Sequence, residues 1–337
     1  MKVQEIPSGA RSIDALRCVE RPDPEPGPGQ VVVRVRAASL NYRDQAVITG
    51  NYFGGVVQSD IIPLSDGAGE VVAVGPGVTR VRTGDRVAGT FFLGYADGPP
   101  AGTYAARGAP PADGMLAEYA LLDEQDAVRI PPALSFEEAA ALPCAAVTTW
   151  HALIETCGVR PGDTVLALGT GGVATFALLF ARTAGARVIL TSSSDEKLER
   201  ARTLGAWAGI NYRRHPDWEQ KVLELTDGAG ATHVVETGGP GTLAKSMQAV
   251  AFGGNIALIG VLAGLTGETN PHPIMRKGAS MHGIFVGNRA MFERMNRAIE
   301  VNGLHPVIDR VFGFDEAPEA YRYQQSGSLF GKVVIRI

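Results

Sequence analysis

Residues 164–194 read TVLALGTGGVATFALLFARTAGARVILTSSS, and this stretch decides the fold. It opens with a short apolar run at 164–168, which has the length of a buried strand. After a glycine-rich turn, apolar residues fall on one face of a 3.6-residue period and predict a helix over 173–184. A second apolar strand is predicted at 187–191. Strand, glycine turn, helix and strand in this order predict a βαβ unit that binds a dinucleotide.

The turn itself contains Gly169, Gly171 and Gly172, and Val173 follows. A Cβ here would keep the backbone away from a pyrophosphate, whereas bare backbone lets the N–H groups at the helix N-terminus face the phosphates. Ala174 takes the place of the third glycine, where alanine is the tolerated variant. Taken alone, three glycines also suit a plain strand–helix turn. The surrounding βαβ pattern favours dinucleotide binding.

The end of the second strand indicates which dinucleotide is bound. An NAD site usually has Asp or Glu there to hold the ribose 2′-hydroxyl. This chain has three serines at 192–194, with Lys197 one turn further on and Tyr212 after the next apolar stretch. Hydroxyls and a cation favour the 2′-phosphate of NADP. The alternative is a helix-capping serine and a solvated lysine, and Asp195 in the first turn also suits that reading.

Length and composition restrict the function classes. A chain of 337 residues suggests about two domains, and 45% hydrophobic with 20% charged residues suits a globular protein. A net charge of -4 provides no basic footprint for nucleic acid or for a membrane surface. The three cysteines, Cys18, Cys144 and Cys157, are widely spaced and form neither a disulfide framework nor a zinc motif. With no apolar signal or membrane-spanning segment, we expect a cytoplasmic protein.

The organisation along the chain predicts two domains. Residues 1–125 contain short strands broken by Gly and Pro, as in a small barrel, and residues 304–337 return to this pattern and complete it. Residues 126–303 contain the dinucleotide-binding pattern. The long loop at 90–114 is rich in aromatic residues and suggests a substrate lid.

Several sequence blocks together resemble the medium-chain dehydrogenase/reductase superfamily, and they lie in the order of that family. The blocks are Asn41–Asp44, Asp66–Gly75, Gly84–Val87, Ala141–Thr149, the glycine turn and Gly331–Val334. The resemblance implies an α/β fold, with a GroES-like β-barrel catalytic domain and a Rossmann domain built on a doubly wound parallel sheet.

This chain departs from the zinc-dependent members of that family. It has residues 64–66 (Leu-Ser-Asp) where they have Gly-His-Glu, and residues 39–41 (Ser-Leu-Asn) at the place of a ligand cysteine. The loop at 90–114 lacks their four structural-zinc cysteines, and His151 reads as a packed or capping histidine. The pattern therefore most resembles the zinc-free quinone oxidoreductase branch, which includes zeta-crystallin, and predicts no metal site.

The resemblance also implies roles for individual residues. Asn41 is expected beside the nicotinamide, with Tyr42 and Tyr52 as candidates for substrate contact or proton delivery, although Tyr52 equally suits a surface loop. The predicted cofactor-binding residues are Asn41, Thr148, Gly169, Gly171, Gly172, Val173, Ser192, Ser193, Lys197, Tyr212, Ile259, Phe285, Val286 and Lys332.

The function expected from these features is NADPH-dependent hydride transfer to a quinone or an α,β-unsaturated carbonyl, without zinc. One alternative is a zinc-free alcohol or aldehyde dehydrogenase, and another is a crystallin-like protein that binds NADPH without catalysis. The apolar run at 281–286 predicts an edge strand, and because relatives pair there, we expect a homodimer.

Overall fold

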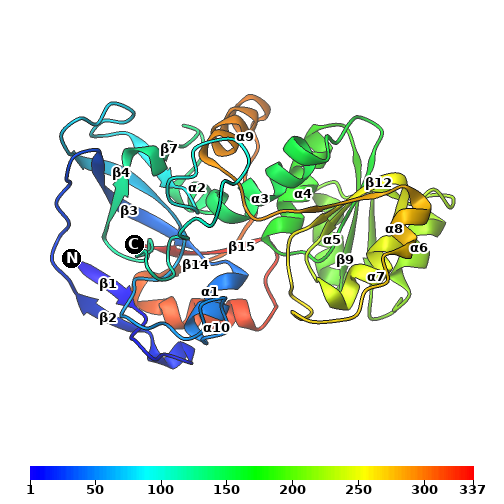
Figure 1. Cartoon of the computed structure of the whole chain (residues 1–337), viewed down its shortest axis with the longest axis horizontal. Coiled ribbons are helices and arrows are strands. Elements are labelled where there is room, and N and C mark those ends of the chain that lie inside the picture. The colour runs from blue at the N-terminus through cyan, green and yellow to red at the C-terminus, as the bar shows by residue number, and fades with distance from the viewer. The chain divides into compact units, whose positions relative to one another are not determined.

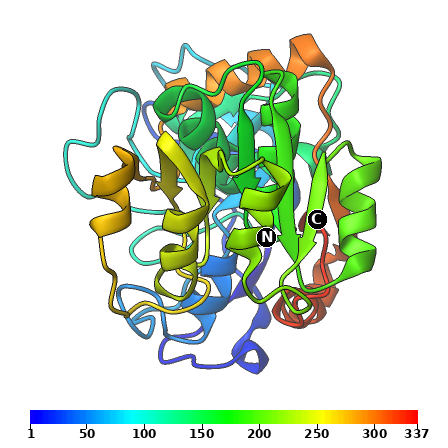
Figure 2. The same cartoon turned by 90° about the vertical axis from the view of Figure 1, so that its right-hand side faces the viewer.

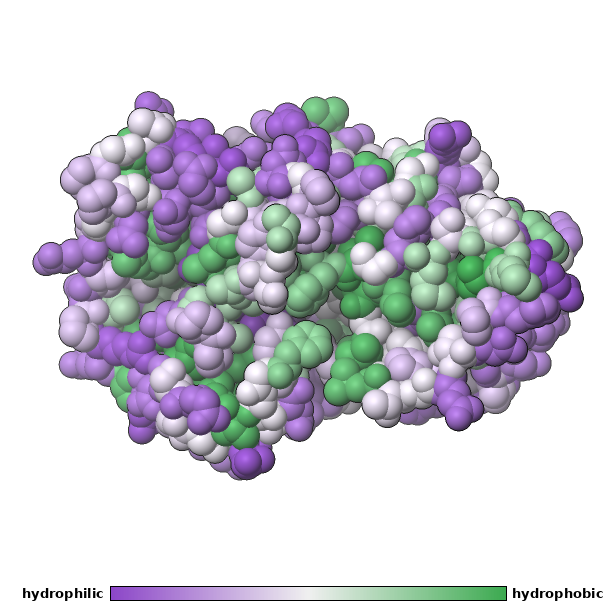
Figure 3. All heavy atoms as spheres, viewed as in Figure 1, coloured by the Kyte–Doolittle hydropathy of each residue, from purple (hydrophilic) through white to green (hydrophobic).

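The structure is a computed structural model that describes all residues, Met1–Ile337, and it contains two compact units (Figure 1). The first unit comprises Met1–Val147 and Gly287–Ile337, and the second unit comprises Thr148–Val286. None of the helices combines the length and the apolar character needed to cross a lipid bilayer. On the face drawn in Figure 3, hydrophilic and apolar side chains are interspersed.

The second unit is built on a sheet of six parallel strands in the order β10-β9-β8-β11-β12-β13 (Figure 2). Counted from its first strand, this order is 3-2-1-4-5-6, the doubly wound arrangement that reverses direction between β8 and β11. The strands are β8 (Thr164–Ala167), β9 (Arg187–Ser192), β10 (Ala208–Asn211), β11 (Ala231–Glu236), β12 (Val250–Leu258) and β13 (Ser280–Gly283). The helices are α4 (Gly172–Thr183), α5 (Asp195–Thr203), α6 (Trp218–Leu225), α7 (Pro240–Ala249) and α8 (His272–Lys277).

The central βαβ prediction is confirmed, because β8, α4 and β9 match the predicted elements to within one residue. Leu166, Ile189, Val234 and Ile256 from four neighbouring strands are fully buried in one apolar cluster. Successive residues of β8, β9 and β11 are buried on both faces, because helices cover both sides of a doubly wound parallel sheet.

The first unit is organised around β3 (Gln30–Ser39). This long strand pairs antiparallel with β4 (Asp66–Val74), β6 (Tyr119–Asp123) and the C-terminal strand β15 (Lys332–Arg336). The remaining strands are β1 (Lys2–Glu5), β2 (Arg17–Glu20), β5 (Arg86–Gly89), β7 (Ala127–Arg129) and β14 (Ile308–Gly313). The C-terminal tail therefore forms part of this unit.

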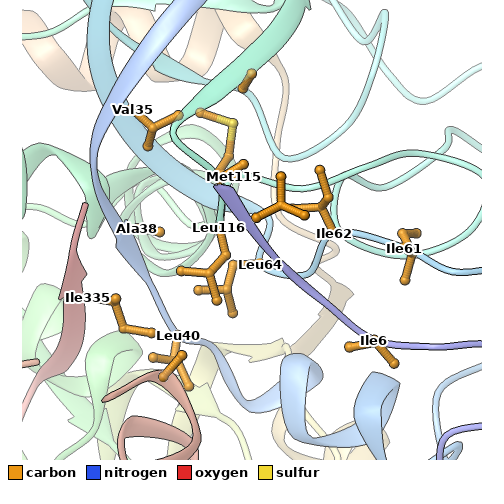
Figure 4. Packing of buried hydrophobic residues seen from close by; sticks show 14 of the residues in the cluster. Ile6, Val35, Ala38, Leu40, Ile61, Ile62, Leu64, Met115, Leu116 and Ile335 are labelled. Carbon is orange, nitrogen blue, oxygen red and sulfur yellow. The ribbon is translucent and has the colours of Figure 1, made fainter. Parts of the chain in front are cut away.

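The core of the first unit joins residues from distant parts of the chain. Figure 4 shows Val35 from β3, Leu40 directly after it and Ile335 from β15 among the same buried side chains as Leu64 and Met115. All five are at most 2% exposed. This shared core holds the C-terminal strand beside residues 35–40, and that placement matters for the site described below.

The boundaries between the units lie at 147 and 287, where the sequence predicts 125 and 304. Helix α2 (Phe136–Ala140) packs on β3 and β4 of the first unit. Helix α9 (Arg289–Asn302) is also tied to that unit, because Asn296 Nδ2 donates to Arg129 O (2.9 Å) and Arg80 pairs with Glu293 (2.6 Å). Tertiary packing of both helices sets these boundaries.

The segment 136–156 is helical but of mixed type, although Pro143 lies within it. Helix α2 is followed by a π-helical segment at Leu142–Ala146, by α3 (Val147–Trp150) and by a second π-helical segment at His151–Thr156. Pro143 lies in the first turn of its segment, where a backbone N–H has no partner to lose. The proline is therefore tolerated without a break.

The loop at 90–114 is a packed structure and does not expose its aromatic residues as a lid would. Phe91, Phe92 and Tyr95 are 2%, 5% and 5% exposed, and the Tyr95 and Tyr104 rings stack with centroids 4.6 Å apart. Residue Arg107 is also buried in this loop. Aromatic packing is thus what orders the loop.

Candidate functional site

The turn after β8 leaves room for a phosphate group. Gly169 has φ +87°, in the left-handed region that favours glycine, and Gly171 is the N-cap of α4. A Cβ built on Gly171 meets no atom within 4 Å, so the space in front of the turn is open. Gly172 and Val173 begin the helix, where the first N–H groups have no intrahelical acceptor and the helix dipole favours an anion. These residues fit the pyrophosphate of a dinucleotide.

Threonine side chains hold this turn in place, and the sequence analysis did not identify them. The bonds join Gly169 N to Thr191 Oγ1 (3.1 Å), Thr175 Oγ1 to Gly172 O (3.0 Å) and Thr149 Oγ1 to Val173 O (3.3 Å). Thr148, a predicted cofactor-binding residue, precedes Thr149 and is 3% exposed. In the sequence, only the presence of a threonine near the glycine turn could indicate such hydrogen bonds.

The three serines at the end of β9 have different roles. Ser194 is the N-cap of α5, where its hydroxyl accepts from Lys197 N (3.3 Å), so the capping alternative applies to this serine. Ser192 lies opposite Asn211 in the pairing with β10, and Tyr212 N donates to Ser192 O (3.0 Å). The structure therefore brings the ends of β9 and β10 together and leaves Ser193 partly exposed between them.

The acidic residue nearest to these serines has its charge compensated. Asp195 accepts from Asn211 Nδ2 (2.9 Å) and forms an ion pair with Arg214. Its carboxylate is thus engaged by one donor at the end of β10 and one from the segment after it. This arrangement reduces the repulsion that Asp195 would exert on a phosphate at the tip of β9.

The segment after β13 is held in an unusual conformation. Val286 has φ +51°, which is rare for a β-branched residue. Its carbonyl oxygen lies 2.7 Å from His151 Nδ1, and because a carbonyl can only accept, Nδ1 carries the hydrogen. His151 is therefore a packed histidine that is hydrogen-bonded to the backbone. Phe285 is 54% exposed, and Ile259 N donates to Glu236 O (2.9 Å) at the end of the neighbouring strand.

A buried carboxylate supports the loop at the end of β11, beside the point where the strand order reverses. Glu236 is fully buried and accepts from Gly238 N (2.7 Å), Gly239 N (3.0 Å), Thr242 Oγ1 (2.6 Å) and Ser246 Oγ. Four neutral donors stabilise its charge where no cation is available. Glu236 is not among the residues predicted from the sequence, because its role depends on donors that the fold brings together.

In the first unit, Lys332 and Asn41 form the centre of a buried polar cluster. Lys332 Nζ donates to Asn41 Oδ1 (2.6 Å) and to Leu40 O (2.6 Å), and its side chain is 3% exposed. Both are predicted from the sequence as cofactor-binding residues. The structure shows that the ammonium group of Lys332 is directed at Asn41.

Three further residues complete this cluster, and the sequence analysis assigned them no role. Ser65 Oγ donates to Asp66 Oδ1 (2.7 Å), Cys144 N donates to Asp66 Oδ2 (3.1 Å), and Asp66 lies 3.8 Å from Lys332 Nζ. Ser65 and Asp66 are both completely buried. Burial and the adjacent Asp66 carboxylate raise the pKa of the Cys144 thiol, so this cysteine is not a thiolate nucleophile.

The backbone beside this cluster is strained at a non-glycine residue. Leu64 has φ +68°, and it stands where zinc-dependent relatives are expected to have glycine. Gly108 and Gly114 pack closely against it, since a Cβ on Gly108 would lie 2.6 Å from the Leu64 carbonyl carbon. Close packing therefore holds a conformation that leucine would otherwise avoid.

The two predicted tyrosines have different surroundings. Tyr42 is the first residue of α1 (Tyr42–Ile48) and is 57% exposed. Tyr52 is half-buried, and the Arg43 guanidinium lies 4.8 Å from the centre of its ring. Burial raises the pKa of the Tyr52 hydroxyl, which makes it a weaker proton donor. The predicted roles of both tyrosines stay predictions.

Comparisons with known proteins identify the family. The alcohol dehydrogenase GroES-like domain matches residues 27–132, and the zinc-binding dehydrogenase domain matches residues 172–301. A zinc-type alcohol dehydrogenase-like protein of Schizosaccharomyces pombe is 46% identical over 320 residues, which cover 92% of this chain and 91% of that protein. The chain belongs to the medium-chain dehydrogenase/reductase superfamily.

Other relatives of this dehydrogenase/reductase agree with that assignment. The quinone oxidoreductase of Pseudomonas aeruginosa is 38% identical over 321 residues, which cover 92% of each chain. The solved structure of an NAD-dependent alcohol dehydrogenase has a TM-score of 0.92 at 34% identity, and the match covers 100% of both chains. The predicted GroES-like domain and Rossmann-type parallel sheet are thereby confirmed.

The residues of this dehydrogenase/reductase do not fit a catalytic zinc ion. At the positions of the expected zinc ligands it has the amide of Asn41 and the hydroxyl of Ser65, which are 3.5 Å apart. The Lys332 ammonium contacts the same amide and would repel a dication. No group of three or more His, Cys, Asp or Glu side chains is placed to hold a metal ion. Zinc requires such ligands in a tetrahedral set.

We predict that the purified protein contains well below one zinc ion per chain. A chelator should leave its Tm and its activity unchanged, because the amide, hydroxyl and ammonium groups of the cluster cannot replace zinc ligands. Elemental analysis after gel filtration measures the metal content. One equivalent of tightly bound zinc per chain would contradict the prediction.

A second prediction concerns Asp44, which is 1% exposed and has no partner for its Oδ1 atom. Burial raises the pKa of this carboxyl from 3.8 to about 6. The folded protein then binds the proton more tightly than the unfolded chain, so stability should fall as pH rises from about 4 to about 6. A shift of about two pKa units corresponds to about 3 kcal/mol.

Asp44→Asn removes this titration while it keeps an acceptor for the Asn41 N–H. The free energy of unfolding of the variant, measured relative to that of the parent, should therefore rise by about 3 kcal/mol between pH 4 and pH 7. Urea titrations across this range measure the difference. A difference that is the same at every pH would show that the carboxyl is not perturbed by burial.

Proposed function

We propose that this dehydrogenase/reductase is an NADPH-dependent reductase of quinones or α,β-unsaturated carbonyl compounds that works without zinc. The observation that carries the proposal is the cluster of Lys332, Asn41 and Asp66 at the place of the expected metal ligands. Without a metal to polarise a simple carbonyl, a conjugated acceptor is the easier substrate, because its π system delocalises the charge that develops. The name of the Pseudomonas aeruginosa relative supports a quinone as the acceptor.

Bound NADPH would supply a hydride to one end of the conjugated system, and a proton from water would complete the two-electron reduction. The second unit would hold the cofactor through the glycine turn, the serines at the tip of β9 and the residues at the ends of β12 and β13. By family resemblance, we propose that Asn41 faces the nicotinamide and that Thr148 contacts its carboxamide or ribose. The protein then contributes orientation and exclusion of water.

An assay of NADPH oxidation with a panel of quinones and enones tests this proposal. Rapid turnover of conjugated acceptors and slow oxidation of simple alcohols are expected. Preference for alcohols with NADP would support the alternative of a zinc-free alcohol dehydrogenase. The names of two relatives contain the words alcohol dehydrogenase, one of them as a zinc-type protein. Tight NADPH binding without any turnover would instead indicate a non-catalytic protein.

Cofactor preference provides a sharper prediction. Ser192 and Ser193 can donate to a 2′-phosphate, and Lys197 can add a charge-assisted bond worth roughly 1.5–3 kcal/mol. Asp195 already pairs with Arg214 and no acidic residue ends β9. NADPH should therefore bind at least about tenfold more tightly than NADH, a ratio for which roughly 1.4 kcal/mol suffices.

Replacement of Lys197 by Ala should remove most of this preference while the affinity for NADH stays nearly unchanged. Arg202→Ala is a matched control, because it removes a cation from the last turn of the same helix. Calorimetric titration of both cofactors against the three proteins decides the matter. Equal affinities in the unmutated protein, or tighter NADH binding, would show that the serine turn does not select NADP.

We also propose a symmetric homodimer that forms through β13. This strand is shorter than predicted, ending at Gly283, and it pairs only with β12 at the edge of the sheet. Met281 on it is 37% exposed, and an unpaired edge favours association.

Light scattering at micromolar concentration should give the mass of a dimer or a multiple of it. Met281→Asp should weaken the assembly, whereas Val301→Asp on α9 should not, and a monomeric parent protein would contradict the proposal.

A further inference from the structure

The hydrogen-bond donors around Asn41 fix the orientation of its side-chain amide. Lysine is a donor only, so the atom 2.6 Å from Lys332 Nζ must be the amide oxygen, and an amide flip is excluded. The Nδ2 group therefore points away from the ammonium. The amide oxygen is thus engaged by the ammonium, and Asn41 can offer its N–H groups to a ligand.

Lys332 is held in place on several sides. It is 3% exposed, and a buried ammonium is stable only with hydrogen-bond partners and a counter-charge. Leu40 O and Asn41 Oδ1 provide the partners, and Asp66, at 3.8 Å, provides the charge. The position of the ammonium, and with it that of the amide, is therefore well determined.

The cluster leaves the Nδ2 group of Asn41 underused. Both oxygens of Asp66 are occupied, one by Ser65 Oγ and the other by Cys144 N. Ser65 Oγ is the acceptor that remains for Nδ2, and at 3.5 Å this is a long bond. An amide nitrogen has two hydrogens, so at least one is available to a ligand.

We propose that Lys332 is a positioning residue that locks and polarises the Asn41 amide, and that Asn41 Nδ2 is the hydrogen-bond donor to the reacting oxygen of the substrate. This inference rests on the proposed function, in which negative charge develops on a quinone or enone oxygen. A fixed donor in a site of low dielectric stabilises such charge without reorganisation. The ammonium on Oδ1 withdraws electron density from the amide and strengthens its N–H as a donor.

Kinetics of four variants test the inference. Asn41→Ala should lower kcat by about 100-fold or more, the usual loss for one such donor, with little change in the KM for NADPH. Lys332→Met should show a similar loss, and the double variant should be no worse than Asn41→Ala alone, since Lys332 acts through that amide. Additive losses would overturn the positioning role. Lys277→Met is the matched control, because Lys277 donates to two backbone carbonyls in the second unit.

Asn41→Asp tests the donor without removing the partner of Lys332. The aspartate can accept from the ammonium, so this variant should unfold at or above the parent Tm, yet it presents an acceptor where the substrate oxygen needs a donor. It should lose at least as much kcat as Asn41→Ala. A folded Asn41→Asp protein with the parent kcat would overturn the inference, even if Lys332→Met does not fold.

Nuclear magnetic resonance separates this inference from the proposed function. The side-chain amide signals of Asn41 are identified by their loss in Asn41→Asp. In the parent protein they should exchange slowly with solvent, and in Lys332→Met they should shift and exchange faster. If no quinone or enone is turned over, the proposed function fails, but this measurement still tests whether Lys332 fixes the orientation of the Asn41 amide. Unchanged Asn41 signals in a folded Lys332→Met protein would contradict it.

Discussion

A buried ammonium group must be supplied with both counter-charge and hydrogen bonds, and much of the first unit serves this need at Lys332. The lysine begins the C-terminal strand. Its partner Leu40 directly follows the long strand β3, and its partner Asn41 is the N-cap of α1. Asp66 begins β4, the next strand of the sheet. The antiparallel pairing of β15 and β4 with β3 therefore brings the charge and its partners together. Displacement of any one strand would leave a charged group buried without compensation, which is costly.

The second unit also contains a buried charged group, the carboxylate of Glu236, but no cation lies beside it. Glu236 is as deeply buried as Asp66, but it is stabilised by two backbone N–H groups and two hydroxyls. Both carboxylates lie at the end of a strand and organise a neighbouring loop. In one unit the result is a loop at the edge of a doubly wound sheet, where ligands bind in such folds. In the first unit, Asp66 helps to hold Lys332, which in turn fixes the side-chain amide of Asn41.

The cluster also clarifies the relation of this chain to its zinc-type relatives. The backbone has a positive φ at Leu64, a conformation that a glycine would adopt with ease. The loop at 90–114 contains none of the structural-zinc cysteines expected of zinc-dependent members, and stacked aromatic rings order it instead. In this unit, aromatic packing and a buried ammonium group therefore stand where the zinc-dependent pattern would place metal ligands.

The sequence by itself determined the βαβ unit, the glycine turn and the order of the two domains, because these depend on local periodicity and on residues adjacent in the chain. It also provided the serines at the tip of β9, although only the structure separated the capping Ser194 from Ser192 and Ser193. Tertiary structure decided the unit boundaries, the burial of the loop at 90–114 and the contact between Lys332 and Asn41, which are 291 residues apart. Such contacts depend on strand pairing between distant segments, and no local pattern encodes which side chains will meet across a sheet.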